Sequence, residues 1–212
     1  MARADGTGHP EVLSQNSNPQ NPQSFTPNGT RLAFVEIGPS TGADIWTMPV
    51  EIGASGLRAG KPEVFLQTPH HERGPVFSPD GRWLAYISNE SGDYRVYVEA
   101  FPNKGAKRQV TPDGNSAPIW SRNGKDLFFV QFRERQLMTI PYKSAGGSFE
   151  TGRPLVWSTQ IALFTAAKSY DPAPDGKRVV VLMPADAPQA AHDHLIFLFN
   201  FFDELRRRLP SS

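Results

Sequence analysis

The sequence predicts an all-β fold, a β-propeller with about four blades of four antiparallel strands each. A short phrase occurs four times: F-T-P-N-G-T-R-L-A-F from residue 25, F-S-P-D-G-R-W-L-A-Y from 77, W-S-R-N-G-K-D-L-F-F from 120 and A-P-D-G-K-R-V-V-V from 173. Its glycines, at positions 29, 81, 124 and 176, are spaced by 52, 43 and 52 residues. A strand-rich repeat of about 40–50 residues is typical of propeller blades rather than of helical arrays.

Each copy of the phrase predicts a β-hairpin. Asp or Asn followed by Gly supplies the positive φ that tight two-residue turns require, and a Pro before the turn is tolerated because its missing N–H is not needed there. In the copy around Gly81 we expect an inner strand at 76–78, a turn at 79–81 and a second strand at 82–88. The polar turn residues are expected to bond their own backbone; they are Asn28, Asp80, Asn123 and Asp175.

Two further strands are predicted after each hairpin. Short aromatic and β-branched segments follow loops of turn residues at 44–50, 94–100, 135–142 and 194–200. A shorter fourth element is expected at 63–66, 108–111 and 155–158. Four strands per repeat is the blade pattern of a propeller, and a helical period is confined to the tail.

The expected domain organisation assigns the blades to residues 24–70, 73–112, 115–160 and 165–200. Residues 1–23 are expected to be a mostly flexible leader because they are rich in Asn, Gln, Ser, Pro and Gly. A closing strand is expected at 11–14, where Val12 and Leu13 would pair beside 195–198 and remove an open sheet edge. Residues 201–212 are expected to form a short helix or tail. Two arrangements stay open: a closed ring of four blades, or the C-terminal part of a larger propeller.

Composition and charge exclude several classes of function. Lys and Arg total 22 against 21 acids, so the net charge is +1 and no basic stripe for nucleic acid is formed. The chain has no cysteine, which excludes disulfides and thiolate chemistry. The first residues lack the apolar core of a secretory signal, and the longest apolar run, 195–202, is too short to insert into a membrane. As written the chain is expected in the cytoplasm; as a piece of a longer protein, it would be periplasmic or membrane-tethered.

The phrase from residue 77, together with N-E-S-G at 89–92 and Y-V-E-A-F-P at 97–102, resembles the WD-repeat-like propellers of the TolB type. The resemblance runs from about residue 11 to 209. It is strongest to the C-terminal propeller that bacteria attach to serine/threonine kinases and related regulators, and W-S-R-N-G at 120–124 and the tail at 199–207 fit the closing segments of that family. The resemblance implies a binding or scaffolding module. The chain itself carries no glycine-rich phosphate loop, H-R-D or D-F-G motif of a kinase.

The candidate binding site lies where fourth strands lead to the next inner strand. These segments, at 67–74, 112–117 and 159–170, are expected to crowd the mouth of the central channel, and loops on a rigid scaffold often carry binding residues. The site residues proposed there are His71, Glu72, Arg73, Asn115, Lys168 and Tyr170. An alternative for Glu72 and Arg73 is an ion pair between blades.

Catalytic and metal-binding interpretations of the sequence are weaker. The G-P-S-T-G segment at 38–42 matches a hydrolase nucleophile pattern, but a strand follows where a helix is needed, so Ser40 is expected in a hairpin loop. His70, His71 and Glu72 form one possible set of metal ligands, and His192 with His194 another, but neither converges at a typical ligand spacing. We therefore expect no cofactor and no metal.

Two functions remain from the sequence alone. The first is a non-catalytic interaction or scaffold module that binds a protein or peptide partner, without nucleic acid or membrane insertion. Self-association is expected if the blades leave open edges. The alternative is a hydrolase-type propeller, a glycosidase or lactonase, or the propeller gate of an enzyme similar to prolyl oligopeptidase.

Overall fold

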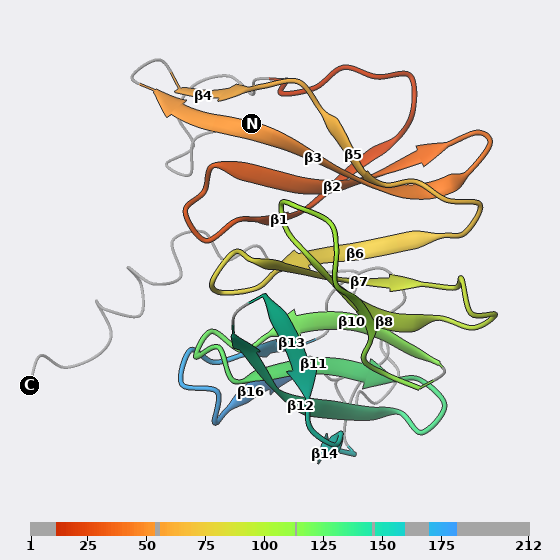
Figure 1. Ribbon diagram of the computed structural model, residues 1–212, viewed down its shortest axis with the longest axis vertical. Helices are drawn as coiled ribbons and strands as arrows, with labels where there is room; N and C mark the ends of the chain where they lie inside the picture. The colour runs from red at the N-terminus through yellow and green to blue at the C-terminus, as the bar shows by residue number, and fades with distance from the viewer. Residues whose placement is uncertain (1–11, 54–55, 113, 146, 160–169, 182–212) are drawn as a thin grey trace, which may run out of the picture.

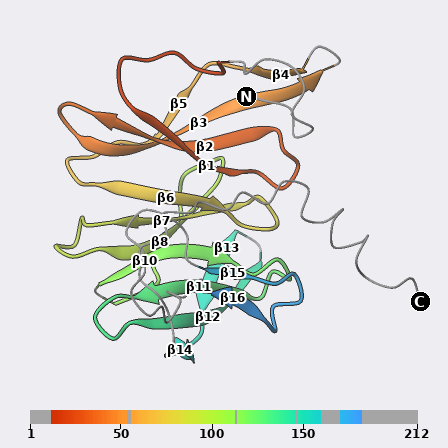
Figure 2. The same cartoon turned by 180° about the vertical axis from the view of Figure 1, so that it is seen from behind.

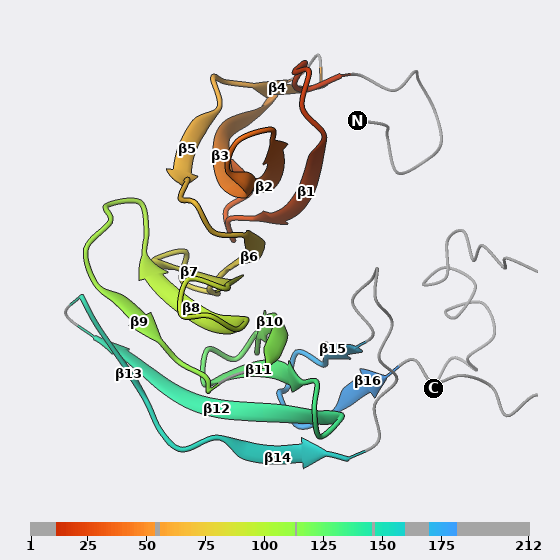
Figure 3. The ribbon, with the colours of Figure 1, turned by 90° about the vertical axis from the view of Figure 1, so that its right-hand side faces the viewer.

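The computed structural model describes residues 12–53, 56–112, 114–145, 147–159 and 170–181, and in these ranges sixteen strands form four antiparallel sheets without a helix. The sheets follow one another in chain order from one end of the molecule to the other (Figure 1). Turned by 90°, they are arranged along an arc, with β1–β5 at one end and β15–β16 at the other (Figure 3). The predicted all-β propeller fold is confirmed.

Three of the four sheets are complete blades. The first contains β1 (Gln20–Phe25), β2 (Arg31–Gly38), β3 (Gly42–Gly53), β4 (Gly56–Ala59) and β5 (Glu63–Leu66). The second contains β6 (Glu72–Phe77), β7 (Trp83–Ser88), β8 (Arg95–Ala100) and β9 (Lys107–Gln109). The third contains β10 (Asn115–Trp120), β11 (Asp126–Gln131), β12 (Gln136–Ala145), β13 (Ser148–Thr151) and β14 (Leu155–Ser158), and the described part of the fourth contains β15 (Tyr170–Pro172) and β16 (Val179–Val181).

The unequal repeat lengths have a structural cause. In the first and third blades the third strand continues beyond the sheet and folds back as a hairpin, β3–β4 and β12–β13. The second blade has no such hairpin, and a short loop joins β8 to β9. The two steps of 52 residues therefore contain an extra hairpin, and the step of 43 does not. These two hairpins were not predicted.

The four turns that connect inner and second strands are alike. In each, the Oδ1 atom of the Asx residue accepts the N–H two residues later, at 2.9–3.2 Å, as predicted for Asn28, Asp80, Asn123 and Asp175. The following glycines have φ between 67° and 71°. The loop is longer than the two-residue turn we expected, because Ser78 N–H bonds to the Trp83 carbonyl and four residues lie between them. Only the glycine needs a positive φ.

The inner strands begin earlier than predicted. We expected residues 67–74 and 112–117 to be loops, whereas β6 begins at Glu72 and β10 at Asn115. Both strands contain a register shift at the residues that look like strand breakers, Gly74-Pro75 and Ala117-Pro118. Gly74 has φ 61° and Ala117 has φ 50°. A β-bulge absorbs such residues without ending the strand, which is why residues that suggest a loop lie within these two strands.

The first blade also begins earlier in the chain than predicted. β1 begins at Gln20, inside the segment assigned to the leader. Glu36 of β2 fixes the preceding residues, because its buried carboxylate accepts hydrogen bonds from the side-chain amides of Asn16 (2.7 Å), Asn18 (2.9 Å) and Gln20 (2.8 Å). The predicted pairing of Val12 and Leu13 with 195–198, the strand at 194–200 and the helix at 201–212 involve residues outside the described ranges, so they stay predictions.

Candidate functional site

The predicted binding site lies at the end of the blades where the inner strands begin, which we call the entry end and define by the loops 38–42, 67–71 and 89–94. The view from behind shows how these loops gather along one side of the first two blades (Figure 2). The segment at 38–42 is a turn between β2 and β3, since Gly38 pairs with Gly42. Ser40 thus lies in a hairpin loop, as predicted.

Glu72 is the central residue of the entry end. It is the first residue of β6 and is completely buried. Its Oε1 atom accepts hydrogen bonds from the hydroxyls of Thr68 (2.6 Å) and Ser88 (3.4 Å), and its Oε2 atom has no partner among the described residues. Glu72 is therefore held by Ser88 of its own blade and by Thr68 of the loop that follows the first blade. The ion pairs between described residues do not include the one with Arg73 that the sequence left open, and Arg73 is exposed.

The protonation of Glu72 is perturbed. Burial raises the pKa of its carboxyl above the ordinary value, and the nearby charges of Asp44 and Glu90 raise it further, while the hydrogen bonds from Thr68 and Ser88 act in the opposite direction. Asp44 itself is buried and accepts hydrogen bonds from Thr41 (2.5 Å) and Gln67 (3.1 Å). The entry end thus concentrates acidic groups, of which Glu72 and Asp44 are held by neutral donors.

His71 links the first two blades. Its backbone N–H donates to Asn89 Oδ1 at 2.8 Å, and its ring Nδ1 accepts the Ala43 N–H at 3.4 Å. The ring lies directly against Gly42, where an added Cβ would come within 2.6 Å of it and where φ is 85°. A glycine is required there for both reasons. His71 therefore has a structural role between blades.

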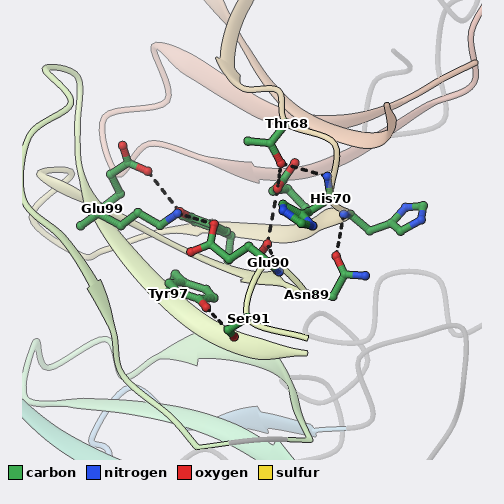
Figure 4. A network of polar contacts seen from close by, with 12 residues as sticks. Thr68, His70, Asn89, Glu90, Ser91, Tyr97 and Glu99 are labelled. Atoms are coloured by element: carbon green, nitrogen blue, oxygen red, sulfur yellow. Dashed lines mark hydrogen bonds and ion pairs between the residues drawn. The ribbon is translucent and has the colours of Figure 1, made fainter. Parts of the chain in front are cut away.

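A polar network extends from these residues across the second blade (Figure 4). The Ser88 hydroxyl accepts the Glu90 N–H, and Glu90 forms an ion pair with Lys107 at 2.5 Å. The Lys107 ammonium lies 4.9 Å from the centre of the Tyr97 ring. The Tyr97 hydroxyl is 2.9 Å from Ser91 Oγ. The network stabilises the loop 89–94 against the sheet.

The other predicted site residues do not join this group. Tyr170 is buried, and its hydroxyl donates to the Ala117 carbonyl of the third blade at 2.5 Å. It therefore connects blades and is not available to a ligand. Asn115 begins β10. Lys168 and the pair His192 and His194 lie outside the described residues.

Within the described ranges, no three His, Cys, Asp or Glu side chains are grouped so as to hold a metal ion, although His70, His71 and Glu72 are adjacent. No helix formed by the described residues is long and apolar enough to cross a bilayer.

A groove at the opposite end of the blades was not predicted. This turn end is defined by the turns 26–30 and 79–82 and the loop 101–106. The groove has a volume of about 680 Å³ and lies between the first and second blades. Its lining residues are Thr26, Pro27, Asn28, Thr30, Arg31, Glu63, Asp80, Gly81, Phe101, Pro102 and Asn103.

The groove is lined by one aromatic ring and by several charged side chains. Phe101 packs edge-on against Phe77, with ring centroids 4.8 Å apart. The Arg31 guanidinium lies 5.9 Å from the centre of the Phe101 ring and bonds to Glu63 at 2.8 Å. Asp80 bonds to Ser78 and Arg82; burial raises the pKa of its carboxyl, but these bonds outweigh that effect, so the pKa lies below its ordinary value. The hydrogen bond and the charge of Arg31 likewise lower the pKa of Glu63, so both acids of the groove stay ionised at neutral pH.

The sequence held no signal for this groove. Arg31 occupies a position that holds Trp83 and Asp126 in the next two repeats and Arg178 in the fourth, so the repeated pattern does not single it out. Phe101 follows a strand as one aromatic residue among many. The groove arises because the second blade has a loop at 101–106 where its neighbours have hairpins.

Comparison with known proteins gives two partial relatives, whereas no family model matches the chain. The chain is 31% identical over 129 residues to the uncharacterized peptidase YuxL of Bacillus subtilis, which covers 59% of the chain and 19% of that protein. It is 31% identical over 104 residues to the Tol-Pal system protein TolB of Ruthia magnifica, which covers 48% of the chain and 24% of that protein. The chain thus spans less than a quarter of either relative.

Solved structures agree with the architecture. TolB from Acinetobacter baumannii superposes with a TM-score of 0.61 at 18% identity, over 88% of this chain and 43% of that one. The fold is that of a TolB-type propeller. A Bacteroides uniformis protein assigned as a 6-phosphogluconolactonase superposes with a TM-score of 0.57 at 17% identity, over 85% and 55% of the two chains. At these identities the likeness concerns the fold.

Proposed function

We propose that this chain is a non-catalytic propeller module that binds a protein or peptide partner, and that the partner occupies the groove at the turn end. The observation that carries the proposal is the groove itself. Its volume of about 680 Å³ lies in the range typical of ligand sites, about 300–1,000 Å³. The groove is lined by an aromatic ring and by charged side chains, and protein interfaces are enriched in aromatic residues and Arg within a polar rim.

The acidic groups at the entry end support the non-catalytic part of the proposal. A general acid or base must reach its substrate, whereas Glu72 is completely buried and Glu36 is surrounded by three amides. Their hydrogen bonds connect strands and loops within the first two blades. We infer that these carboxylates stabilise the fold.

The relatives are compatible with such a module. One is named as a protein of the Tol-Pal system and the other as a peptidase. The resemblance of the repeated phrase to propellers fused to bacterial serine/threonine kinases adds a finer proposal: the module serves as the recognition part of a larger regulator. In that setting the propeller would bind and the attached domain would act.

One observation favours a second function. The pKa of Glu72 is raised, its Oε2 atom lacks a partner among the described residues, and perturbed carboxyls gather at catalytic sites. A hydrolase that uses Glu72 as an acid would have to expose its carboxyl at the entry end, since it is buried in this structure. A panel of esterase, lactonase, glycosidase and peptidase substrates tests this function; turnover by the wild type that is lost in Glu72→Gln would establish it.

The binding proposal is tested with peptides selected on the immobilised full chain from a random display library. Selected peptides are expected to bind the wild type and to lose at least about tenfold in affinity with Arg31→Ala, since a desolvated charged contact contributes about 1.5–3 kcal/mol. Arg133→Ala is the matched control, because Arg133 pairs with Asp93 at the entry end, outside the groove. Peptides whose affinity is unchanged by Arg31→Ala would refute the groove as the binding site.

A further inference from the structure

The charged groups of the turn-end groove differ in how far their polar atoms are already used. The Oδ1 atom of Asp80 accepts hydrogen bonds from the Ser78 hydroxyl at 2.6 Å and from the Arg82 main-chain N–H at 3.1 Å. Its Oδ2 atom accepts the Arg82 Nε–H at 2.9 Å and the Ser144 hydroxyl at 3.3 Å. A carboxylate offers about four acceptor sites. Those of Asp80 are therefore taken by its own turn and by the hairpin β12–β13.

Arg31 is the opposite case, because part of its guanidinium is unused. Its Nη1 atom donates to the Thr47 hydroxyl at 3.0 Å and to Glu63 Oε2 at 2.8 Å. Its Nε and Nη2 atoms form no hydrogen bond with the described residues. Thr47 is buried, and the Arg31 side chain is 21% exposed. The guanidinium is thus held in place while the donors of Nε and Nη2 remain for a ligand.

A second arginine borders the same aromatic ring. Phe101 also lines a hollow of about 150 Å³, together with Arg82 of the second blade and Ala145 and Gly147 of the third. The Arg82 side chain is 57% exposed, and its Nη1 atom has no partner among the described residues. The groove and this hollow share Phe101, so each of the two depressions contains an arginine with unused donors beside one apolar ring.

The ion pair between Arg31 and Glu63 favours an anion over a cation as the ligand. The Glu63 side chain is 56% exposed, and exposed ion pairs are weak. A carboxylate can bind Nε and Nη2 side by side without breaking this pair, because those two N–H groups match the two carboxylate oxygens. A cation would find one open carboxylate oxygen, Glu63 Oε1, next to the positive charge of Arg31, which repels it.

We propose that the groove recognises an acidic segment of its partner. One carboxylate of an extended peptide binds Arg31, a second reaches Arg82, and an apolar side chain between them packs on Phe101. The inference rests on the proposed function, since it specifies the chemistry of the peptide that this groove binds. Pairs of arginine and carboxylate are directional, and a guanidinium already held by Thr47 and Glu63 loses little conformational freedom when a ligand binds.

The proposal is tested on the peptides selected by display on the immobilised full chain, which are expected to be enriched in Asp and Glu. Each peptide is resynthesised with its acidic residues changed to Asn or Gln, and both versions are titrated with the wild type by fluorescence anisotropy. The neutral version should bind at least about tenfold more weakly, because charge-assisted hydrogen bonds are lost. This difference should shrink in Arg31→Ala and in Arg82→Ala, since each variant removes one partner of the carboxylates.

Glu63→Gln should have an effect of opposite sign. It removes the carboxylate that competes for Arg31, so the acidic peptide should bind more tightly than to the wild type, whereas a groove that recognises cations would bind its ligand more weakly. Arg133→Ala, at the entry end, should leave the affinities of both peptide versions unchanged. Near-ultraviolet circular dichroism checks that the variants are folded, and the comparison of the two peptide versions on the wild type needs no variant.

The contrary results separate this inference from the proposed function. Selected peptides that lose affinity in Arg31→Ala but contain no acidic residue, or bind equally well once neutralised, would overturn the acidic segment and leave the groove as the binding site. Weaker binding of the acidic peptide to Glu63→Gln would also overturn it. Peptides whose affinity does not depend on Arg31 would overturn the groove itself, and the acidic segment with it.

Discussion

The indole N–H of Trp120 donates a hydrogen bond of 3.0 Å to the main-chain carbonyl of Val76, across the boundary between the second and third blades. The same ring packs edge-on against Tyr142 and Phe149, with centroids 4.8 Å and 5.9 Å away. Trp120 is 6% exposed. One side chain thus combines apolar burial with a directional bond to the neighbouring blade.

We expect Trp120→Ala to lower the free energy of unfolding by about 3–5 kcal/mol, the usual loss for a buried aromatic ring. Trp120→Phe keeps most of the packing and loses the bond to Val76, so its loss should be about 1 kcal/mol. Denaturant unfolding followed by circular dichroism measures both. The control is Trp157→Phe, where the ring is 39% exposed. Equal losses for Trp120→Phe and Trp157→Phe would show that the inter-blade bond contributes nothing.

The parts of the fold that could be predicted from the sequence are those fixed by local chemistry. Asx-Gly turns form because the side chain bonds its own backbone and glycine adopts a positive φ, and all four turns follow this rule. The fourth strands Glu63–Leu66 and Leu155–Ser158 lie where their apolar residues indicated. These features depend on a few neighbouring residues.

The features that were missed depend on contacts between distant residues or on exceptions to local rules. Gly74 and Pro75 suggested a loop, but a bulge keeps them within β6. His71 was expected to bind a ligand, and its environment is set by Gly42 and Ala43 of the preceding blade. No pattern within residues 67–74 contains that information. The unequal spacing of the repeats does contain a signal for the extra hairpins, because the two longer steps each include one.

The amide cluster around Glu36 gives a prediction about the N-terminal segment. Glu36→Ala should speed amide hydrogen exchange in residues 12–20 and lower the free energy of unfolding by about 1–3 kcal/mol, because three side-chain amides lose their acceptor. Mass spectrometry of exchanged peptides locates the effect. Asp44→Asn is the control, since Asp44 bonds to Thr41 and Gln67 and should leave exchange at 12–20 unchanged. Unaltered exchange in Glu36→Ala would contradict the anchoring role.

The buried carboxyl of Glu72 predicts a dependence of stability on pH. Its pKa is raised in the folded protein, so the contribution of its protonated form is complete below the ordinary value of 4.5 and is lost as the pH rises through the folded value. The free energy of unfolding of Glu72→Gln, minus that of the wild type, should therefore increase above pH 4.5, with a slope of at most about 1.4 kcal/mol per pH unit.

Glu63 provides the control of opposite sign. Hydrogen bonding and the charge of Arg31 lower the pKa of Glu63, so its contribution is present above the ordinary value and is lost as the pH falls. Because Glu63 is exposed, the effect of Glu63→Gln should be small. Unfolding curves in urea at a series of pH values measure both variants. A difference for Glu72→Gln that does not change with pH would contradict the buried, protonated state.

The hairpin β12–β13 gives the last prediction, which concerns the boundary between the second and third blades. Phe149 of β13 lies 5.1 Å from the Trp83 ring of β7, centroid to centroid, so the hairpin extends over the preceding blade. Phe149→Ala should lower the free energy of unfolding by about 3–5 kcal/mol. It should also speed hydrogen exchange in β7 and β10, because both strands line the boundary that loses the ring.

Leu57→Ala is the matched substitution in the hairpin β3–β4, since Leu57 stands at the corresponding position and packs within the first blade and on Leu13. It should lower stability while leaving exchange in β7 and β10 at the wild-type rate. If Phe149→Ala changes exchange only within β12 and β13, the hairpin does not clamp the two blades together. Its extra residues would then lengthen the third blade without strengthening the boundary, and the alternation of long and short repeats would have no part in holding the blades together.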